Sequence, residues 1–593
     1  MCGIVGYIGN KKCVPMIIDG LESLEYRGYD SSGIAYIKDS KVIIKKECGK
    51  IENLKKIIDL DEDSYLGIGH TRWATHGKPC KVNSHPHKVG KITLVHNGII
   101  ENYDSLKKEL NYYDCISETD SEIVACLINL LYEEEKNMIK VLNKLKDYLI
   151  GSYALGIIVD GEDRVYAIRK DSPLIIGVSD DGNFIASDVP AILRYTNKYY
   201  LLDNNEYVVL EKDKVIIYNN ENIVEKDLCV FEGSLDSAML NRYDHFMLKE
   251  IYEQPKVIMD TINEYVNDMD KFNELFNGLE EYTGIDIVGC GSAYHAGLIG
   301  KSLISKYGKV VVNTDIASEY RYNDHIYSKR HLVILISQSG ETADTLAVLR
   351  KVKEQWIDTL AIVNVVGSSI AREADRVIYT KAGCEISVAT TKAYSCQVMI
   401  LSLMAFYFGI KNDILRVIEL EEYKNISKYI EDILDDVSDV YEVAQIIYDK
   451  KDIYFLGRKI DYSLCMEASL KLKEVSYIHS EAYAAGELKH GTISLIEEGT
   501  PVISLITDDS IRLKTLSNIK EVCARGALSI IISDCDIEDS GLYQRLILIP
   551  KVSEFIEPIL VMIKCQLIAY YVALLNRCDI DKPRNLAKSV TVE

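Results

Sequence analysis

The sequence predicts an α+β domain followed by two α/β domains, each built on a doubly wound parallel sheet. Up to about residue 230, many short apolar runs are separated by glycine, with only two long helical patterns among them. Beyond residue 275, apolar runs alternate regularly with helical patterns, which is typical of a parallel sheet. This second portion also contains two similar halves, which indicates a duplication. The 593 residues exceed the roughly 250–300 at which one core stops growing, so several domains are expected.

The expected strands of the first portion are short and rich in β-branched residues. They lie at 2–9, 31–37, 41–47, 65–75, 91–100, 152–159 and 164–170. Two helices are expected over 13–28 and 117–134, and the start of the second, Ser117-x-x-Asp120, resembles a capping box. This mixture predicts two antiparallel sheets with helices on their outer faces, over residues 2–230.

The second portion begins with a polar link and a helical lead-in over 231–275. A strand, a glycine turn and a helix are expected at 285–297, and a second such segment at 332–346. The same order of elements recurs at 451–463 and 501–516. These repeats predict one α/β domain over 276–425, another over 426–578, and a tail over 579–593.

Composition and charge exclude several classes of protein. A formal net charge of −22 disfavours nonspecific binding to nucleic acid or anionic membranes. No apolar run reaches the roughly 18 residues that a membrane-spanning helix needs, and the richest, 396–410, is expected to be a buried helix. The 15 cysteines form no C-x-x-C pair and no secretory signal precedes them, which predicts reduced thiols in the cytoplasm. His85, His87 and His96 cluster, but Pro86 and the lack of a nearby carboxylate argue against a metal site.

Cys2 directly follows the initiator Met, and a small second residue favours removal of Met1. Cys2 would then carry both a thiol and a free α-amine. At a thiol pKa of about 8.5, only a few per cent is thiolate at neutral pH, and an α-amine titrating at about 7.7–8.0 could act as its base. The simpler alternative is a buried first strand with an incidental cysteine.

A further set of candidate functional residues follows strands or begins a helix in the first portion. These residues are Arg72, Trp73, Thr75, His76, Asn97, Gly98 and Asp120. Taken singly, they have structural explanations: an exposed arginine, a hairpin turn and a helix cap. Together with a terminal thiol they fit one reaction, because an Asn amide and a Gly N–H are donors that an oxyanion needs. An Arg and an Asp could hold the carboxylate and ammonium of a free amino acid whose side-chain carbonyl is attacked.

Five motifs in this order resemble the N-terminal-nucleophile glutamine amidotransferase domain: MCGIVGYIG, LEYRGYDSSG, HTRWATHG, HNGIIENY and SETDSE. The resemblance implies a four-layer αββα fold with Cys2 as nucleophile and Asn97 and Gly98 as the oxyanion hole. It implies Arg72 and Asp120 as clamps on glutamine, with Trp73, Thr75 and His76 beside them. Trp73 also resembles the indole that gates an internal ammonia channel.

The second portion contains a strand, a Ser/Gly-rich turn and a helix at 332–346. Ser337, Gln338, Ser339 and Thr342 offer hydroxyls, an amide and helix N-terminal N–H groups, a set suited to an anion. Because the segment lacks G-K-[ST], a phosphomonoester on a small molecule suits it better than a nucleoside triphosphate. An ordinary helix cap is the alternative.

Three charged residues, Glu467, Lys471 and Glu474, share one face of a predicted helix. A solvated salt-bridge face is the usual meaning of this spacing, but the helix is otherwise largely apolar. A carboxylate there could move a proton between adjacent carbons, as sugar isomerisation requires. His490 is a candidate for opening a sugar ring, and Lys588, near the C-terminus, for a Schiff base with a ketose.

SQSGETADTL, EISVATTKAY, ASLKLKEVSYIHSEAYAAGELKHG and DKPRNLAKSVTVE resemble the sugar isomerase (SIS) domains of the isomerising glutamine–fructose-6-phosphate aminotransferase family. The resemblance implies Glu474 as the base between C1 and C2, Lys588 as the Schiff-base lysine and His490 as the ring-opening residue from the neighbouring subunit. It implies Glu467 and Lys471 in the sugar site, and Ser292, Ser337, Gln338, Ser339 and Thr342 around the phosphate. Ala293 departs from the family pattern, which usually has a hydroxyl there.

The two resemblances together imply a cytoplasmic homodimer that converts fructose 6-phosphate and glutamine to glucosamine 6-phosphate and glutamate, the first step of amino-sugar synthesis. Ammonia would pass between the two sites, with no metal, flavin or nucleotide cofactor and no nucleic-acid or membrane partner. Other sugar-phosphate or phosphoribosyl amidotransferases are alternatives, as is a sugar-phosphate-sensing regulator. The duplicated α/β half disfavours a phosphoribosyl acceptor, and the lack of a basic helix-turn-helix segment disfavours a regulator.

Overall fold

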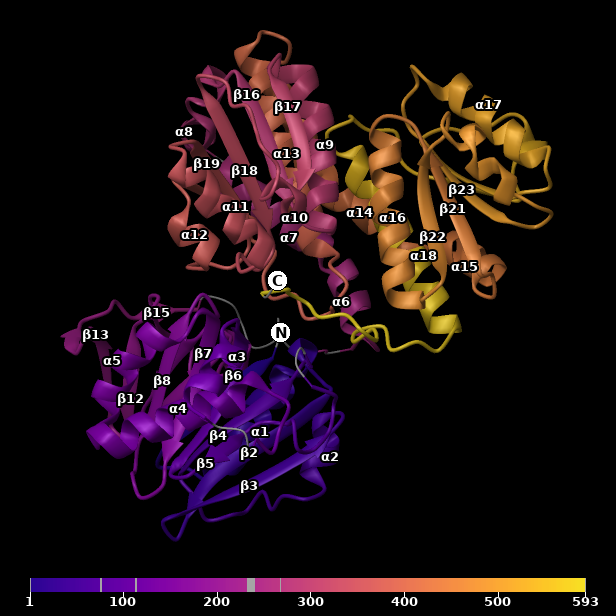
Figure 1. Ribbon diagram of the computed structural model, residues 1–593. Coiled ribbons are helices and arrows are strands. Elements are labelled where there is room, and N and C mark those ends of the chain that lie inside the picture. Colours follow the sequence, from indigo (N-terminus) through magenta and orange to yellow (C-terminus); the bar gives the residue numbers. More distant parts are fainter. Residues whose placement is uncertain are drawn as a thin grey trace. The chain divides into compact units, whose positions relative to one another are not determined.

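The first apolar run of the chain forms β1 (Gly3–Gly9), which is buried along its whole length. The computed structural model describes residues 2–74, 77–111, 115–231, 240, 242–266 and 268–591. Contacts divide the chain into two units, Met1–Ala238 together with Ala587–Glu593, and Met239–Leu586 (Figure 1).

The first unit contains two antiparallel sheets. The order in the eight-stranded sheet is β15 (Cys229–Val230), β11 (Lys198–Leu201), β9 (Ile175–Ser179), β10 (Gly182–Ala186), β1, β4 (Leu66–Arg72), β2 (Ser31–Lys38) and β3 (Lys41–Cys48). The order in the seven-stranded sheet is β14 (Asn222–Val224), β13 (Lys214–Asn219), β12 (Tyr207–Glu211), β8 (Val165–Lys170), β7 (Gly151–Val159), β6 (Ile92–Ile100) and β5 (His87–Val89). The seven expected strands are all present.

The two sheets enclose one apolar layer, which includes Ile4 of β1, Val95 of β6 and Ile185 of β10. On the outer face of the first sheet lies α1 (Cys13–Ser23), and on that of the second lie α4 (Asp120–Glu135) and α5 (Met138–Tyr148). Gly69 lets α1 approach β4 closely, because a Cβ there would meet Ile17 Cγ2 at 2.4 Å. Two short helices, α2 (Ile51–Lys55) and α3 (Tyr103–Glu109), complete the layers. The expected four-layer αββα arrangement is confirmed.

The start of α4 differs from the capping box predicted at Ser117. The helix begins at Asp120, and its N-cap, Thr119, makes no side-chain capping bond. Instead, the Glu122 carboxylate reaches back and accepts from the backbone N–H groups of Ile116 and Ser117. The prediction was wrong because Glu122 satisfies the backbone before the helix.

The second unit contains two parallel five-stranded sheets with the same strand order. The first is β17 (Val311–Ile316), β16 (Gly284–Gly289), β18 (His331–Ser337), β19 (Asp358–Val363) and β20 (Arg376–Tyr379). The other is β22 (His479–Ala484), β21 (Asp452–Gly457), β23 (Pro501–Ile506), β24 (Leu528–Ser533) and β25 (Arg545–Leu548). The identical order confirms the duplicated α/β architecture expected from the repeats.

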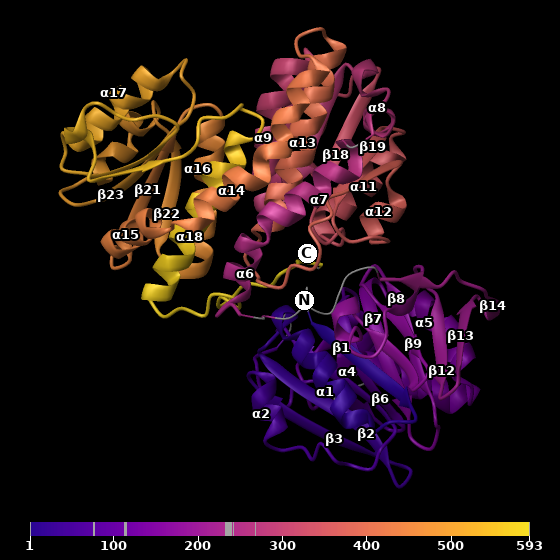
Figure 2. The same cartoon turned by 180° about the vertical axis from the view of Figure 1, so that it is seen from behind.

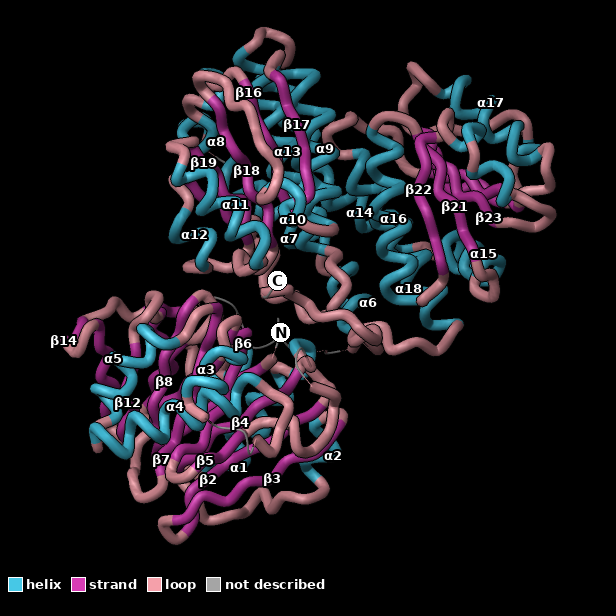
Figure 3. The backbone as a smooth tube through the Cα atoms, viewed as in Figure 1, coloured by secondary structure: helices cyan, strands magenta, loops and turns pink. Residues whose placement is uncertain are grey.

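Helices cover these sheets and predominate in the second unit (Figure 3). With the first sheet are α6 (Phe246–Tyr252), α7 (Gln254–Val266), α8 (Met269–Phe276), α9 (Ser292–Gly308), α10 (Ala317–Tyr320), α11 (Ala343–Glu354), α12 (Ser369–Glu373) and α13 (Lys392–Lys411). With the other are α14 (Ile426–Asp435), α15 (Ser438–Ile447), α16 (Ile460–Ser476), α17 (Arg512–Cys523) and α18 (Glu557–Leu575). α13 runs beside α9 (Figure 2), and α16 packs on α18. α9 also packs on α16, so that one continuous core joins the two halves.

Two helices among the described residues, α13 and α18, are long and apolar enough to cross a membrane. Their apolar windows are 94% and 83% buried inside the protein. Both are therefore core helices of the second unit, as predicted for 396–410.

Candidate active site

A cavity in the first unit opens where the start of β1 meets the end of β4. Gly3 pairs with Thr71, which places Cys2 beside Arg72 and Trp73. The lining residues are Cys2, Arg72, Trp73, His85, His96, Gly98, Thr119, Asp120 and Ser121. The fold thus gathers residues that are up to about 120 positions apart in the sequence around one thiol.

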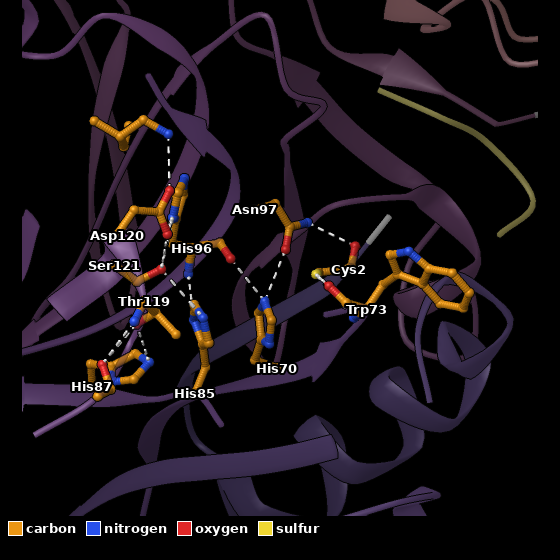
Figure 4. A network of polar contacts seen from close by, with 12 residues as sticks. Cys2, His70, Trp73, His85, His87, His96, Asn97, Thr119, Asp120 and Ser121 are labelled. Atoms are coloured by element: carbon orange, nitrogen blue, oxygen red, sulfur yellow. Dashed lines mark hydrogen bonds and ion pairs between the residues drawn. The ribbon is translucent and has the colours of Figure 1, made fainter. Parts of the chain in front are cut away.

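The Cys2 thiol is held against the backbone of Trp73. The Trp73 N–H donates to Cys2 Sγ at 3.2 Å, and Sγ lies 3.4 Å from the Trp73 carbonyl oxygen (Figure 4). Burial raises the pKa of the Cys2 thiol, although the Trp73 N–H and Arg72 oppose the shift. A buried thiol with a raised pKa needs a base beside it to become a nucleophile.

Asn97 lies on β6 and reaches across from the second sheet to the start of β1. Its Nδ2 donates to the Cys2 carbonyl oxygen at 2.8 Å. The next residue, Gly98, has a φ of +122°, and a Cβ there would meet the Ser152 carbonyl oxygen at 2.0 Å. Glycine is therefore required at 98, and its backbone lines the cavity. Asn97 and Gly98 lie within β6, so the alternative of a hairpin turn is wrong.

Arg72 and Asp120 supply the opposite charges of the cavity. The Arg72 Nη2 donates to the Gly77 carbonyl oxygen at 3.2 Å, and the guanidinium is buried. Asp120 Oδ2 accepts from the Ile100 N–H at 2.9 Å, and Oδ1 from the Ser121 hydroxyl at 3.2 Å. A guanidinium and a carboxylate on one small cavity complement the two charged groups of a free amino acid. Thr75 and His76, predicted beside them, lie outside the described residues.

Sequence reasoning missed a group of buried imidazoles that partly line this cavity and partly lie behind it. His70 stacks on His85 with ring centroids 4.1 Å apart, and His96 Nδ1 lies 2.9 Å from the Ser121 hydroxyl (Figure 4). The sequence pattern singles out His85 and His96 only as metal ligands, and it does not single out His70 in GHTRWATHG. The position of His70 could have revealed it. It lies two residues before Arg72 on β4, where both faces of the sheet are covered.

Burial disfavours protonation of three of these imidazoles, those of His70, His85 and His87. Burial lowers the pKa of His70 to about 3, and it lowers the pKa of His85 and His87 well below the ordinary value. Among the described residues, no group of three or more His, Cys, Asp or Glu side chains is arranged to hold a metal ion. The lowered pKa values make His70, His85 and His87 neutral hydrogen-bonding groups.

In the second unit, the predicted anion-binding residues form one loop between β18 and α11. The Ser337 hydroxyl lies 2.9 Å from the Thr342 hydroxyl and accepts from the Gly340 N–H at 3.0 Å. The Ser339 hydroxyl accepts from the Glu341 N–H at 3.2 Å. Gln338 lies between them, at the carboxyl end of the sheet, where α/β folds bind ligands.

Ser292 and His295, both on α9, share the buried carboxylate of Glu467 on α16. The Ser292 hydroxyl donates to Glu467 Oε1 at 2.8 Å, and His295 Nδ1 lies 2.7 Å from Oε2. His295 was not predicted; its signal is the helix-start motif GSAYHAG that also contains Ser292. Since the Ser292 proton is directed at Glu467, contact of this hydroxyl with a phosphate remains a prediction.

Lys471 lies between the two carboxylates of its own helix and is buried. Its Nζ is 2.5 Å from Glu474 Oε2 and 3.5 Å from Glu467 Oε1. Burial alone would lower the pKa of Lys471, but Glu474 and Glu467 outweigh it and raise the pKa. The predicted spacing on one helix face is confirmed, and the alternative of a solvated salt-bridge face is not what the structure has.

The remaining two predicted residues are more exposed. His490 lies in a short 3-10 turn, Leu488–His490, and is exposed. Lys588 is half-buried in Ala587–Glu593, which belongs to the first unit, whereas Glu474 belongs to the second. Their roles remain predictions.

The fold and the cavity define a glutamine amidotransferase domain joined to a pair of SIS domains. Residues 81–194 match the glutamine amidotransferase domain family, and residues 279–407 and 446–576 each match the SIS domain family. The chain is 47% identical over 610 residues to the glutamine–fructose-6-phosphate aminotransferase [isomerizing] of Caldanaerobacter subterraneus, and 48% identical over 614 residues to that of Clostridium tetani. Both alignments cover 100% of each chain. The protein belongs to the isomerising glutamine–fructose-6-phosphate aminotransferase family.

The second unit also resembles solved structures. The C-terminal domain of glucosamine-fructose-6-phosphate aminotransferase from Francisella tularensis matches with 38% identity and a TM-score of 0.54, over 58% of this chain and 99% of that one. A phosphosugar isomerase structure from Silicibacter pomeroyi, at 20% identity, 57% and 100% coverage and a TM-score of 0.50, shares the fold.

Proposed function

We propose that this protein converts fructose 6-phosphate and glutamine into glucosamine 6-phosphate and glutamate. The observation that carries the proposal is the convergence of Cys2, Arg72, Gly98 and Asp120 on one cavity, in a chain that aligns end to end with aminotransferases of this name. Hydrolysis of the glutamine amide consumes one water and yields glutamate and ammonia. Addition of ammonia to the ketose returns one water and leaves the amino sugar.

In the first half-reaction, Cys2 is the nucleophile and its own α-amine, once Met1 is removed, is the base. The thiolate attacks the side-chain carbonyl, and Asn97 Nδ2 with the Gly98 N–H binds the resulting oxyanion. The tetrahedral adduct collapses to a thiol ester and expels ammonia, which takes the proton held by the α-amine. Water then hydrolyses the thiol ester to glutamate and frees the thiol. Arg72 binds the α-carboxylate of glutamine and Asp120 its α-ammonium, with Thr75 and His76 beside them. Trp73 separates the thiol from the path of ammonia to the second site.

In the second half-reaction, Glu474 moves a proton between C1 and C2 of the amino sugar. Lys471, charged and buried between Glu474 and Glu467, holds the Glu474 carboxylate in place. Lys588 forms the Schiff base with the ketose, and His490 of a neighbouring subunit opens the sugar ring. Ser337, Gln338, Ser339 and Thr342 bind the phosphate, with Ser292 at the edge of the site.

These roles imply a domain organisation, an oligomeric state and a cellular compartment. We propose a glutaminase domain over 2–230, a lead-in over 231–275, SIS domains over 276–425 and 426–578, and a tail over 579–593 that serves the sugar site. The use of His490 across subunits requires a homodimer. The free thiol and the phosphorylated substrate suit the cytoplasm.

Product analysis tests the proposal directly. The purified protein is mixed with glutamine and fructose 6-phosphate, and we expect glucosamine 6-phosphate and glutamate to form in equal amounts. Formation of glutamate alone, or of a different phosphorylated amine from another acceptor, would show that the acceptor is assigned wrongly.

A trapping experiment tests the tail separately. Borohydride reduction in the presence of fructose 6-phosphate should attach the sugar to Lys588, identified by peptide mass. If another lysine is modified and Lys588 stays intact, then Lys588 does not form the Schiff base. The variant Lys588→Arg, which keeps the charge but forms no imine under these conditions, is the matched control.

A further inference from the structure

The ring of His70 lies directly behind the Asn97 amide. Its Nε2 is 2.9 Å from the backbone carbonyl oxygen of His96 and 3.0 Å from Asn97 Oδ1 (Figure 4). A backbone carbonyl can only accept a hydrogen bond. Nε2 must therefore carry the ring proton, which it shares between the two oxygens.

The orientation of the Asn97 amide is fixed from both ends by groups that cannot change roles. On one side the Cys2 carbonyl oxygen accepts from Nδ2 at 2.8 Å, and on the other the His70 Nε2–H donates to Oδ1. An amide nitrogen carries two N–H groups, and the bond to Cys2 uses one of them. The second N–H is the one that can donate a hydrogen bond to an oxyanion beside the Cys2 thiol.

The surroundings keep His70 neutral with its proton on Nε2. The side chain is fully buried, and its Nδ1 has no hydrogen-bond partner among the described residues. One face stacks on His85 at 4.1 Å with an interplanar angle of 13°. Burial lowers the pKa of His70 to about 3, and the nearby positive charge of Arg72 acts in the same direction.

We propose that His70 is a positioning residue for amide hydrolysis: it donates to Asn97 Oδ1 and thereby holds the Asn97 Nδ2 donor toward the oxyanion. A flipped amide would instead place Oδ1 against the developing negative charge. Without the His70 Nε2–H, nothing on the His70 side of Asn97 favours the orientation of the amide that points Nδ2 toward the oxyanion over the flipped one. This inference rests on the proposed glutaminase function, and it concerns the transition state rather than the binding of glutamine.

Two substitutions distinguish the effect of losing the Nε2–H donor from the effect of losing the volume of the imidazole ring. His70→Leu keeps an apolar side chain of similar volume and removes the donor, whereas the His70→Gln amide nitrogen can occupy the place of Nε2. For His70→Leu we expect the kcat for glutamate release from glutamine to fall at least about 10-fold, and by no more than the roughly 10²–10³-fold that complete loss of an oxyanion donor costs. KM should change little, and His70→Gln should recover most of kcat. His87→Leu, which removes a buried imidazole elsewhere in the cluster, is the control and should keep kcat within about 3-fold.

A double-mutant cycle tests whether His70 acts through Asn97. In the Asn97→Ala background, His70→Leu should have no further effect on kcat, because the group that it orients is already gone. Equal losses in both backgrounds would overturn the proposal, since they would show a general structural effect. Unchanged kcat in His70→Leu would overturn it as well.

An aldehyde analogue of glutamine, the γ-semialdehyde of glutamate, provides a readout independent of turnover. Its adduct with the Cys2 thiol places an oxygen in the oxyanion site, whereas the product glutamate binds the clamps alone. We expect His70→Leu to weaken the analogue at least about 10-fold and glutamate hardly at all. Equal weakening of both ligands would contradict the proposal.

If His70→Leu does not fold, His70→Met serves for the same comparison. Absence of glutaminase activity in the wild-type protein would refute the proposed function and not the role of His70 alone.

Discussion

The Ser292 hydroxyl donates to Glu467 Oε1 at 2.8 Å, and this bond joins the first helix of one SIS domain to the second SIS domain. His295, one turn along α9 from Ser292, contacts the other oxygen of the same carboxylate. Burial alone would raise the pKa of Glu467, but Lys471, His295 and Ser292 together lower it. The carboxylate is therefore ionised in a place where an unpaired charge would be unstable.

Glu467→Gln should destabilise the second unit by about 3 kcal/mol, because it leaves Lys471 buried with one carboxylate instead of two. The amide keeps the volume of the side chain, so lost packing contributes little. The measurement is a denaturant titration that follows the second unit. Glutamine hydrolysis should persist below the transition, since Cys2 and its cavity belong to the first unit, and a wild-type midpoint would show that the charge carries no stability.

Cys2→Ala should abolish glutamine hydrolysis and leave the affinity for fructose 6-phosphate unchanged. The substitution removes the nucleophile, while the predicted phosphate loop between β18 and α11 lies in the other unit. Glutamate release and sugar-phosphate binding are measured on the same sample. Glutaminase activity that survives in this variant would exclude Cys2 as the nucleophile.

A chain that retains Met1 should bind the sugar phosphate and fail to use glutamine. Its α-amine would belong to Met1 rather than to Cys2, and burial raises the pKa of the thiol, so little thiolate forms without a base on the same residue. A variant with a bulky residue inserted after Met1 blocks removal, and mass spectrometry reports the N-terminus. Wild-type glutaminase activity with Met1 in place would show that another base serves Cys2.

Gly98→Ala should lower both stability and glutaminase activity. The new Cβ would meet the Ser152 carbonyl oxygen at 2.0 Å, and a φ of +122° strains any residue with a side chain. We expect at least about 2 kcal/mol lost in denaturant unfolding of the first unit. Gly161→Ala is the matched control, because its φ is also positive, +86°, but nothing lies within 4 Å of its Cβ position. Equal losses in the two variants would mean that the close approach at Gly98 is unimportant.

Acid should destabilise the first unit below about pH 6.5. The folded pKa of His70 is lowered to about 3 from an ordinary 6.5, and those of His85 and His87 are lowered as well. Between these values the unfolded chain binds more protons than the folded one, so the free energy of unfolding falls as pH falls, by about 1.4 kcal/mol per pH unit for each histidine. Thermal melting of the full chain between pH 7.5 and 5 measures this, and His70→Gln should reduce the slope. A pH-independent melting temperature for the first unit would contradict the burial of neutral imidazoles.

Much of this architecture follows from local sequence patterns. Short β-branched runs such as 2–9 and 91–100 become strands because β-branched side chains pack well on a pleated surface, and the alternation beyond residue 275 becomes a parallel sheet. The spacing of Glu467, Lys471 and Glu474 fixes their common helix face. Local pattern could not establish the start of α4, because Glu122, and not the predicted Asp120, is the carboxylate that accepts from the Ser117 N–H.

The residue types along the chain indicate which side chains can perform the chemistry: a thiol at residue 2, an amide at 97, a guanidinium at 72 and a carboxylate at 120. The tertiary structure decided how each is used. The pairing of β1 with β4 brings Cys2 to Trp73, His70 faces Asn97 from the other sheet, and Ser292 gives its proton to Glu467. A hydrogen bond depends on a few tenths of an ångström and on which partner is nearest, and these partners lie 27 to 175 positions apart. No pattern along the chain encodes such a pairing until the sheets and helices have packed.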